Sequence, residues 1–416
     1  MNHFADLFRY SIIPIFLLTL FSSCEKSSDA VPQESEINKS ELLEGIQDFQ
    51  WSLFKEAILE EGDQSKNVII SPLSVASALY MALRGADNQT RAGMERALAL
   101  EGISSAEVGM AYQQWISTLT TTEGETRLSP ANAIFWDKQR ILPEQSFLTY
   151  AKQYFDADTY GLDFGNESAL DDINQWVNEK TENRITKILD EIRDDEVMFI
   201  LNALFFTSDW KYPFPLEQTA VRPFSLRDGS IVEVPTMHQD IATLPNLITE
   251  TYQAVDMPFA DSSYRFTMVL PPKEQDIDDF IGNLNASTVQ EIFNNLKSNR
   301  ILLNVPKFSV SYKILLNEPL KRMGMQEAFD PNLADFTKLG SAPEGNLFLS
   351  KVLHKTFLKV DEKGAEGAAV TSIGVGVTSL PPMISFNRPF LFMLWERETN
   401  TIVFIGKMED PGAKTE

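Results

Sequence analysis

Residues Gly364 to Pro382 read GAEGAAVTSIGVGVTSLPP, and this stretch decides which fold the chain can adopt. Between Lys363 and Arg388 the only charged residue is Glu366, and small or β-branched residues fill most of the rest. The β-branched residues favour a strand, whereas the glycines disfavour any single settled conformation. On composition alone, a glycine-rich surface loop is therefore the alternative to a strand.

Alternate positions of this stretch differ in character. Every second residue is small or apolar in the set Ala365, Gly367, Ala369, Thr371, Ile373, Val375 and Val377. The intervening residues include charged, polar and apolar side chains. Because alternate residues of a strand point to opposite faces, one face of this stretch would be uniformly small or apolar and the other would be mixed. We predict a segment that can enter between two existing strands.

The flanks of the stretch carry a family resemblance. Phe357 to Gly364 reads FLKVDEKG and Phe386 to Phe392 reads FNRPFLF. They resemble the two ends of the reactive-centre loop of the serpin family, and the distance between them fits that loop without a gap. Further matches follow in order along the chain, at NVIISPLSV (67–75), TSDWKYPF (207–214), VPTM (234–237), MVLPP (268–272) and NVPKF (304–308). Each is weak alone, but in this order they are highly specific, and the resemblance covers nearly the whole chain from about residue 40.

The resemblance implies an α+β fold. We expect a large, mostly antiparallel central sheet backed by eight or nine helices, a small β-barrel-like layer, and an exposed reactive-centre loop at 362–385. The small layer would include Ile384 to Trp395 and Thr401 to Lys407, a hairpin around the turn at Glu398 to Asn400.

Local patterns agree with this architecture. Leu42, Ile46, Phe49, Leu53 and Ala57 recur at helical spacing. A second helix is predicted to be capped by Ser71, to begin at Pro72 and to end with Gly85 as a left-handed C-cap residue.

The run Val197 to Phe206 is apolar except for Asn202. This pattern predicts a central strand buried on both faces. Asn202 would then need a hydrogen-bond partner inside the protein.

Composition excludes several function classes. The 416 residues are 43% hydrophobic, which suffices for a substantial core. The net charge of −23 argues against nucleic acid and anionic lipid as partners. Cys24 is the single cysteine, so no internal disulfide, cysteine metal site or cysteine nucleophile is expected.

The N-terminus resembles a bacterial lipoprotein signal. An apolar run from Tyr10 to Phe21 follows Arg9 and ends in LFSSC, which is similar to a lipobox. We predict a signal peptide at 1–23, a tether at 24–38 lipidated on Cys24, and a single domain at 39–412. The protein would then be anchored in the cell envelope. The outer membrane is favoured because the residues after Cys24 are Glu25 and Lys26, and neither is the aspartate that would indicate retention in the inner membrane. An ordinary secretory signal is the alternative to the lipobox, and an extracellular location is the alternative to the cell envelope.

No catalytic or metal-binding pattern competes with this interpretation. His238 and His354 lack the spacing of a zinc site, and no G-x-S-x-G elbow occurs. The acidic runs at 194–196 and 276–279 could attract calcium, but such runs are usually solvated. We expect no cofactor, no metal and no enzymatic activity, and a monomeric protein.

The resemblance assigns roles to individual residues. The shutter, a hydrogen-bonded cluster under the centre of the sheet, would comprise Ser71, Ser74, Asn202 and His354. The breach, where insertion starts, would comprise Trp210, Lys307 and Glu362, the last two as an ion pair. The loop hinge would comprise Glu362, Gly364, Ala365, Glu366, Gly367, Ala368 and Ala369. The family's register places the reactive bond at Thr378 and Ser379. An ordinary core histidine is the alternative for His354.

The implied function is suicide-type inhibition of proteases. After cleavage, roughly 15 loop residues at about 3.3 Å each would enter the main sheet and displace the attached protease. Small and β-branched residues at the bond suit elastase-like or subtilisin-like serine proteases, and Val377 would also suit a papain-like cysteine protease. Family inhibitors usually carry threonine or serine at the Ala365 position and alanine at the Gly367 position. A non-inhibitory binding or chaperone-like serpin is therefore the alternative.

Overall fold

The computed structural model describes residues 39–122, 124–343, 345–365 and 381–413. Within these ranges the chain forms nine α-helices and seventeen strands. The helices are α1 (Lys39–Glu61), α2 (Pro72–Gly85), α3 (Asn88–Ala97), α4 (Ser105–Thr120), α5 (Gln145–Phe155), α6 (Ser168–Lys180), α7 (Ile277–Gly282), α8 (Ala286–Asn295) and α9 (Asn317–Leu320). The predicted α+β class is confirmed.

Nine strands form one largely antiparallel sheet, in the order β1-β17-β16-β9-β8-β7-β10-β15 with β6 beside β7. Its members are β1 (Val68–Ile70), β6 (Ala220–Ser225), β7 (Ile231–Ile248), β8 (Gln253–Pro258), β9 (Tyr264–Leu270), β10 (Lys297–Pro306), β15 (Met383–Ser385), β16 (Phe390–Glu396) and β17 (Thr401–Met408). Every residue of β16 and β17 is buried, so this hairpin lies in the core of the sheet.

The late hairpin is confirmed with two corrections, the first being that its strands belong to the nine-stranded sheet and not to a small separate layer. Strands β16 and β17 pair antiparallel, and the Glu396 carboxylate accepts backbone hydrogen bonds from Glu398 and Thr399 at their turn. The predicted first run from Ile384 to Trp395 is two strands, because β15 leaves the hairpin and pairs parallel with β10. Pro389 lies between the two strands and lacks the N–H that a continuous ladder requires.

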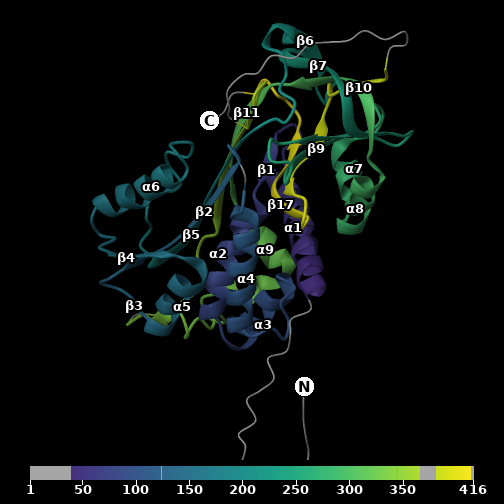
Figure 1. Ribbon diagram of the computed structural model, residues 1–416. Helices are drawn as coiled ribbons and strands as arrows, with labels where there is room; N and C mark the ends of the chain where they lie inside the picture. The colour runs from purple at the N-terminus through teal and green to yellow at the C-terminus, as the bar shows by residue number, and fades with distance from the viewer. Residues whose placement is uncertain (1–38, 123, 344, 366–380, 414–416) are drawn as a thin grey trace, which may run out of the picture. The chain divides into compact units, whose positions relative to one another are not determined.

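The remaining strands form three smaller groups. The four-stranded sheet has the order β14-β5-β2-β4, with β2 (Arg127–Asp137), β4 (Asp158–Leu162), β5 (Met198–Asp209) and β14 (Gly364–Ala365). A two-stranded ladder joins β11 (Phe308–Leu315) to β13 (Leu353–Val360), and another joins β3 (Leu142–Pro143) to β12 (Gly340–Ser341). Helix α6 covers one face of β5 and β2, and α2 packs against the other (Figure 1).

Strand β5 departs from its sequence prediction. Phe199, Leu201 and Ala203 are buried against the α6 side, whereas Met198 and Ile200 on the alternate face are only half-buried. The expectation of burial on both faces is therefore wrong for this end of the strand. The partly uncovered face is the one directed toward α2.

Both predicted helices are present, but glycine occurs at the end of α2 for a different reason from the one predicted. Ile46, Phe49, Leu53 and Ala57 of α1 are buried as their spacing predicts, and the side chain of Leu42 lies outside the described part. Helix α2 begins with a Ser71 cap that accepts a hydrogen bond from the Ser74 N–H. Gly85 is not a left-handed cap, since the cap is Ala86 with φ of −83°. A Cβ at Gly85 would lie 2.5 Å from the Leu339 Cβ, so close packing is what favours glycine there.

The described residues form one compact unit. Inside these ranges we find no helix of the length and apolarity that crossing a membrane would require.

Candidate functional site

The hinge is joined to the end of β5. Gly364 and Ala365 pair antiparallel with Asp209 and Ser208, and Thr207 Oγ1 donates to the Ala365 carbonyl at 2.9 Å. Gly364 has φ of +154°, and a Cβ there would lie 2.1 Å from the Ser208 carbonyl oxygen. Only glycine fits this position without a backbone shift. The Ala365 side chain is 3% exposed, so the hinge enters the core at this residue.

Trp210 holds the backbone on both sides of Glu362, at the start of the hinge. Its indole Nε1 donates to the Asp361 carbonyl at 2.9 Å, and its backbone N–H donates to the Lys363 carbonyl at 2.7 Å. The ring stacks on Phe259 with centroids 4.5 Å apart and is 2% exposed. This buried indole therefore positions the backbone at the start of the hinge.

The expected ion pair is present, and its carboxylate is buried. Lys307 Nζ lies 2.7 Å from Glu362 Oε2, and Thr219 Oγ1 donates to Glu362 Oε1 at 2.8 Å. Glu362 is 6% exposed. Burial acts to raise the pKa of Glu362, but the hydrogen bonds from Lys307 and Thr219 outweigh it and lower the pKa below its ordinary value.

The four predicted shutter residues lie in one connected group. The Ser71 N–H donates to His354 Nε2 at 2.9 Å, and Ser74 Oγ donates to the Asn202 carbonyl at 3.4 Å. The Asn202 side chain donates to Asn132 Oδ1 at 2.9 Å. His354 and Asn202 are thus linked through the cap and first turn of α2, by way of Ser71 and Ser74. Burial lowers the pKa of His354 to about 4, so the imidazole is neutral near pH 7.

An open position lies between β5 and β13. Strand β5 pairs with β2 on one edge and with only the two residues of β14 on the other, and β13 pairs with β11 alone among the described strands. Both strands line the same two cavities, one beside Ala365 and one beside Asn202 and His354. Backbone groups along both edges are therefore available to a further strand.

Several predicted residues cannot be placed. Glu366, Gly367, Ala368, Ala369, Thr378, Ser379 and Cys24 lie outside the described residues, as do the predicted signal peptide and tether at 1–38. Sequence reasoning missed Asn132 and Thr219. Asn132 interrupts an apolar strand as Asn202 does, and this shared feature could have suggested that the two face each other.

The candidate metal sites are accounted for by protein contacts. His238 Nδ1 lies 2.9 Å from Asn304 Oδ1, and His354 bonds to Ser71. Asp195 and Asp278 belong to ion pairs with Arg193 and Arg227, respectively. Across the described ranges, no group of three or more histidine, cysteine or acidic side chains is arranged to hold a metal ion.

Comparison with known proteins connects this geometry to one family. A family model described as "Serpin (serine protease inhibitor)" matches residues 44–411. The chain is 31% identical to alpha-1-antichymotrypsin of Pongo abelii, over 88% of this chain and 86% of that protein. It is similar to the native state of tengpin, a thermophilic serpin, with 33% identity, a TM-score of 0.82, and coverage of 91% of this chain and 96% of that one. Human thyroxine-binding globulin complexed with thyroxine is 28% identical, with a TM-score of 0.81 and coverage of 90% and 100%.

Proposed function

Since this chain belongs to the serpin family, we propose that it is a single-use inhibitor that traps proteases by loop cleavage and insertion. The observation that carries the proposal is the hinge. Gly364 and Ala365 already pair with one edge of β5. The open position between β5 and β13 lies farther along that same edge. A strand that extends from Ala365 would gain backbone hydrogen bonds on both sides.

Insertion would disable the protease mechanically. The loop attached to an acyl-enzyme carries the protease with it as it enters the sheet, and even about 1 Å of displacement in a catalytic site is costly to rate. Serpins are generally inhibitors rather than enzymes, and we infer that this chain is consumed once for each protease it meets.

The proposed targets are elastase-like or subtilisin-like serine proteases. No lysine or arginine occurs from Ala365 to Asn387, so the buried acid of a trypsin-like pocket would find no cation. Thr378 and Ser379 at the proposed bond, preceded by Val377, suit pockets for small or β-branched residues. Papain-like cysteine proteases are a secondary class, because Val377 suits their apolar pocket one position before the bond.

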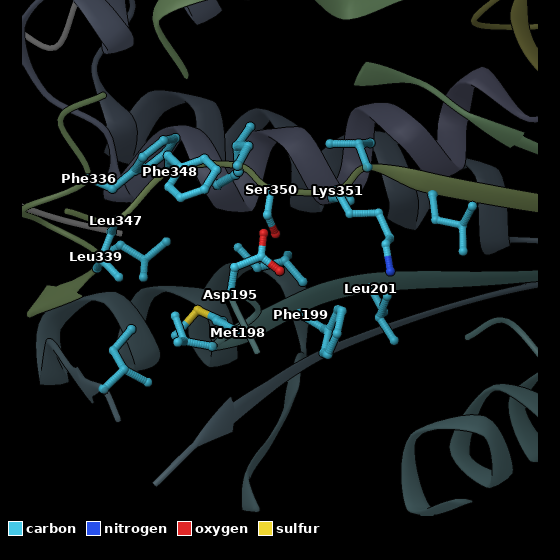
Figure 2. Close-up of a pocket in the computed structure, with 18 of the residues that line it drawn as sticks. Asp195, Met198, Phe199, Leu201, Phe336, Leu339, Leu347, Phe348, Ser350 and Lys351 are labelled. Atoms are coloured by element: carbon cyan, nitrogen blue, oxygen red, sulfur yellow. The ribbon is translucent and has the colours of Figure 1, made fainter. Parts of the chain in front are cut away.

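A non-inhibitory serpin is the second candidate. Gly367 replaces the usual alanine and adds about 0.5–1 kcal/mol to the cost of forming an inserted strand. Thyroxine-binding globulin, which has a similar fold, was solved in complex with a small molecule. This chain also contains a large cavity (Figure 2).

The test compares complex formation with simple cleavage. The protein is incubated with elastase, subtilisin, papain and trypsin, then analysed on denaturing gels and by mass spectrometry of the released peptide. We expect an SDS-stable complex with elastase or subtilisin and a peptide that begins at Ser379. A complex with trypsin alone would overturn the target class. Cleavage without a complex, and with no rise in Tm, would favour the non-inhibitory candidate.

We also propose that the mature protein is lipid-anchored through Cys24 on the cell envelope, facing proteases that reach it. The support is the LFSSC sequence after an apolar run.

A further inference from the structure

Glu409 follows the last residue of β17 and is almost completely buried, with 1% of its surface exposed. One carboxylate oxygen, Oε1, lies 3.2 Å from Arg227 Nη1 and 3.3 Å from Lys407 Nζ. The other oxygen, Oε2, is buried and has no hydrogen-bond partner among the described residues. We propose that Glu409 is a proton-binding site, at which the folded protein takes up a proton in mildly acidic solution and is thereby stabilised against acid.

The two cations beside Glu409 bind Asp278 more closely than they bind Glu409. Lys407 Nζ donates to Asp278 Oδ1 at 2.8 Å, and Arg227 Nη1 donates to Asp278 Oδ2 at 2.7 Å. Both cations also donate to the Gln64 carbonyl at 3.1 Å. Short hydrogen bonds between charged groups are the strong ones, so Glu409 shares donors that a better-placed carboxylate already holds.

Negative charge exceeds positive charge in this cluster. Arg227 also pairs with Asp276, so the three carboxylates of Asp276, Asp278 and Glu409 share the two cations Arg227 and Lys407. Lys407 is 1% exposed, so water screens these charges weakly. A third carboxylate held close to the other two raises the free energy of its own charged form.

The segments packed against Glu409 do not correct this imbalance. Asp63, in the turn after α1, adds another acidic group that interacts with Lys407. Asn67, just before β1, is neutral and accepts the Glu409 N–H at 2.7 Å. Lys66 pairs with Glu61 at 2.8 Å, so the neighbouring cation is engaged on the α1 side.

A proton is the ligand that fits the second oxygen of Glu409. Because Oε2 is sealed from solvent, a larger group could reach it only if the cluster opened. A neutral carboxyl group costs less to bury than a carboxylate, and its Oε1 can still accept from Arg227 and Lys407. In agreement, burial raises the pKa of Glu409 and the Asp278 charge adds to the rise, although Lys407 and Arg227 oppose it.

Glu409 and His354 should act on stability in opposite directions. The pKa of Glu409 in the folded protein is raised above 4.5, so acidification favours the folded state at this residue. Its contribution is fully present below about pH 4.5 and is lost as pH rises through the raised pKa. The contribution of His354 is instead lost as pH falls, because its pKa is lowered to about 4. Proton uptake on Glu409 therefore offsets part of the loss at His354.

Infrared difference spectroscopy of the whole protein tests the proton uptake directly. As pH is lowered from about 7.5, wild type should show a protonated-carboxyl band that is missing from Glu409→Gln. Glu398→Gln is the matched control, because it removes an exposed glutamate at the turn before β17, and it should keep the band. Identical infrared titrations of wild type and Glu409→Gln would overturn the site.

Urea unfolding gives the energetic counterpart. As pH falls, the unfolding equilibrium constant of Glu409→Gln should rise relative to that of wild type by up to tenfold per pH unit, since the variant lacks one linked proton. Glu398→Gln should follow wild type. A ratio that stays constant, or that falls with pH, would refute proton uptake by the folded state.

Asp278→Asn tests the cluster even if Glu409→Gln fails to fold. It removes the carboxylate that binds Arg227 and Lys407 most closely, so both cations become available to Glu409. The Glu409 carboxyl band should then appear at lower pH than in wild type, and a band that stays in place or moves to higher pH would contradict the charge argument. None of these measurements involves a protease, so the proton site and the inhibitor function stand or fall separately.

Discussion

Lys307 Nζ lies 2.7 Å from Glu362 Oε2, so the residue between β10 and β11 is joined to the first residue of the hinge. Because Glu362 is 6% exposed, this pair is not an ordinary surface contact. The buried carboxylate needs both of its partners, Lys307 and Thr219.

Lys307→Ala should lower the free energy of unfolding by about 1–3 kcal/mol, since it leaves a buried charge with one neutral donor. Urea unfolding measures this. Lys338→Ala is the control, because Lys338 pairs with Asp87 where both side chains are exposed, and should cost less than about 1 kcal/mol. If both variants lose the same free energy of unfolding, the buried pair of Lys307 and Glu362 stabilises the protein no more than an exposed ion pair does.

Gly364→Ala should detach β14 from β5. The new Cβ would overlap the Ser208 carbonyl oxygen, so the backbone must shift and the pairing must open. We expect faster hydrogen exchange in a peptide spanning 361–365. Gly282→Ala serves as the control because a Cβ there meets nothing within 4 Å, and unchanged exchange in Gly364→Ala would show that the hinge pairing tolerates a side chain.

Ala365→Arg should convert the inhibitor into a substrate. Ala365 is buried beside β5, and an arginine side chain cannot enter that space with its charge unpaired. The SDS-stable complex with elastase or subtilisin should disappear while loop cleavage continues. Ala106→Arg, on the exposed side of α4, should keep the complex, and a trapped complex with Ala365→Arg would contradict insertion from this residue.

Stability should fall in mild acid because of His354. Its pKa falls from 6.5 to about 4 on folding, so between these values the unfolded chain binds a proton that the folded protein excludes. This contribution is therefore fully present above about pH 6.5 and is lost as pH falls toward 4, by roughly 3 kcal/mol in total. Urea unfolding from pH 8 to pH 4.5 should show a shallower pH dependence for His354→Gln than for wild type. Parallel curves over the whole range would show that His354 is not the group responsible.

Cys24→Ala should release the protein from the membrane fraction. The lipid is the proposed anchor, and a single acyl-modified cysteine is its attachment point. Fractionation followed by immunoblotting measures the change, with Ser23→Ala as the matched neighbour. A Cys24→Ala protein that stays in the membrane fraction would refute the lipobox interpretation.

The chain by itself determined the features whose signals are local. Ser71 and Pro72 start α2 because a cap and a proline act on the adjacent turn, and the Glu398 to Asn400 turn joins β16 to β17 because both partners flank it. The ordered motifs indicate the family without any knowledge of contacts, since each motif is a short run of residues.

Tertiary structure alone decided the rest. Gly85 is required by Leu339, and Asn202 meets Asn132 only because β5 and β2 pair in one register. The open position between β5 and β13, and the cavity beside it, depend on how α2 and the segment before β13 pack across the fold. Capping and periodicity act over a few neighbouring residues, whereas the register and separation of strands are set by side chains far apart in the sequence.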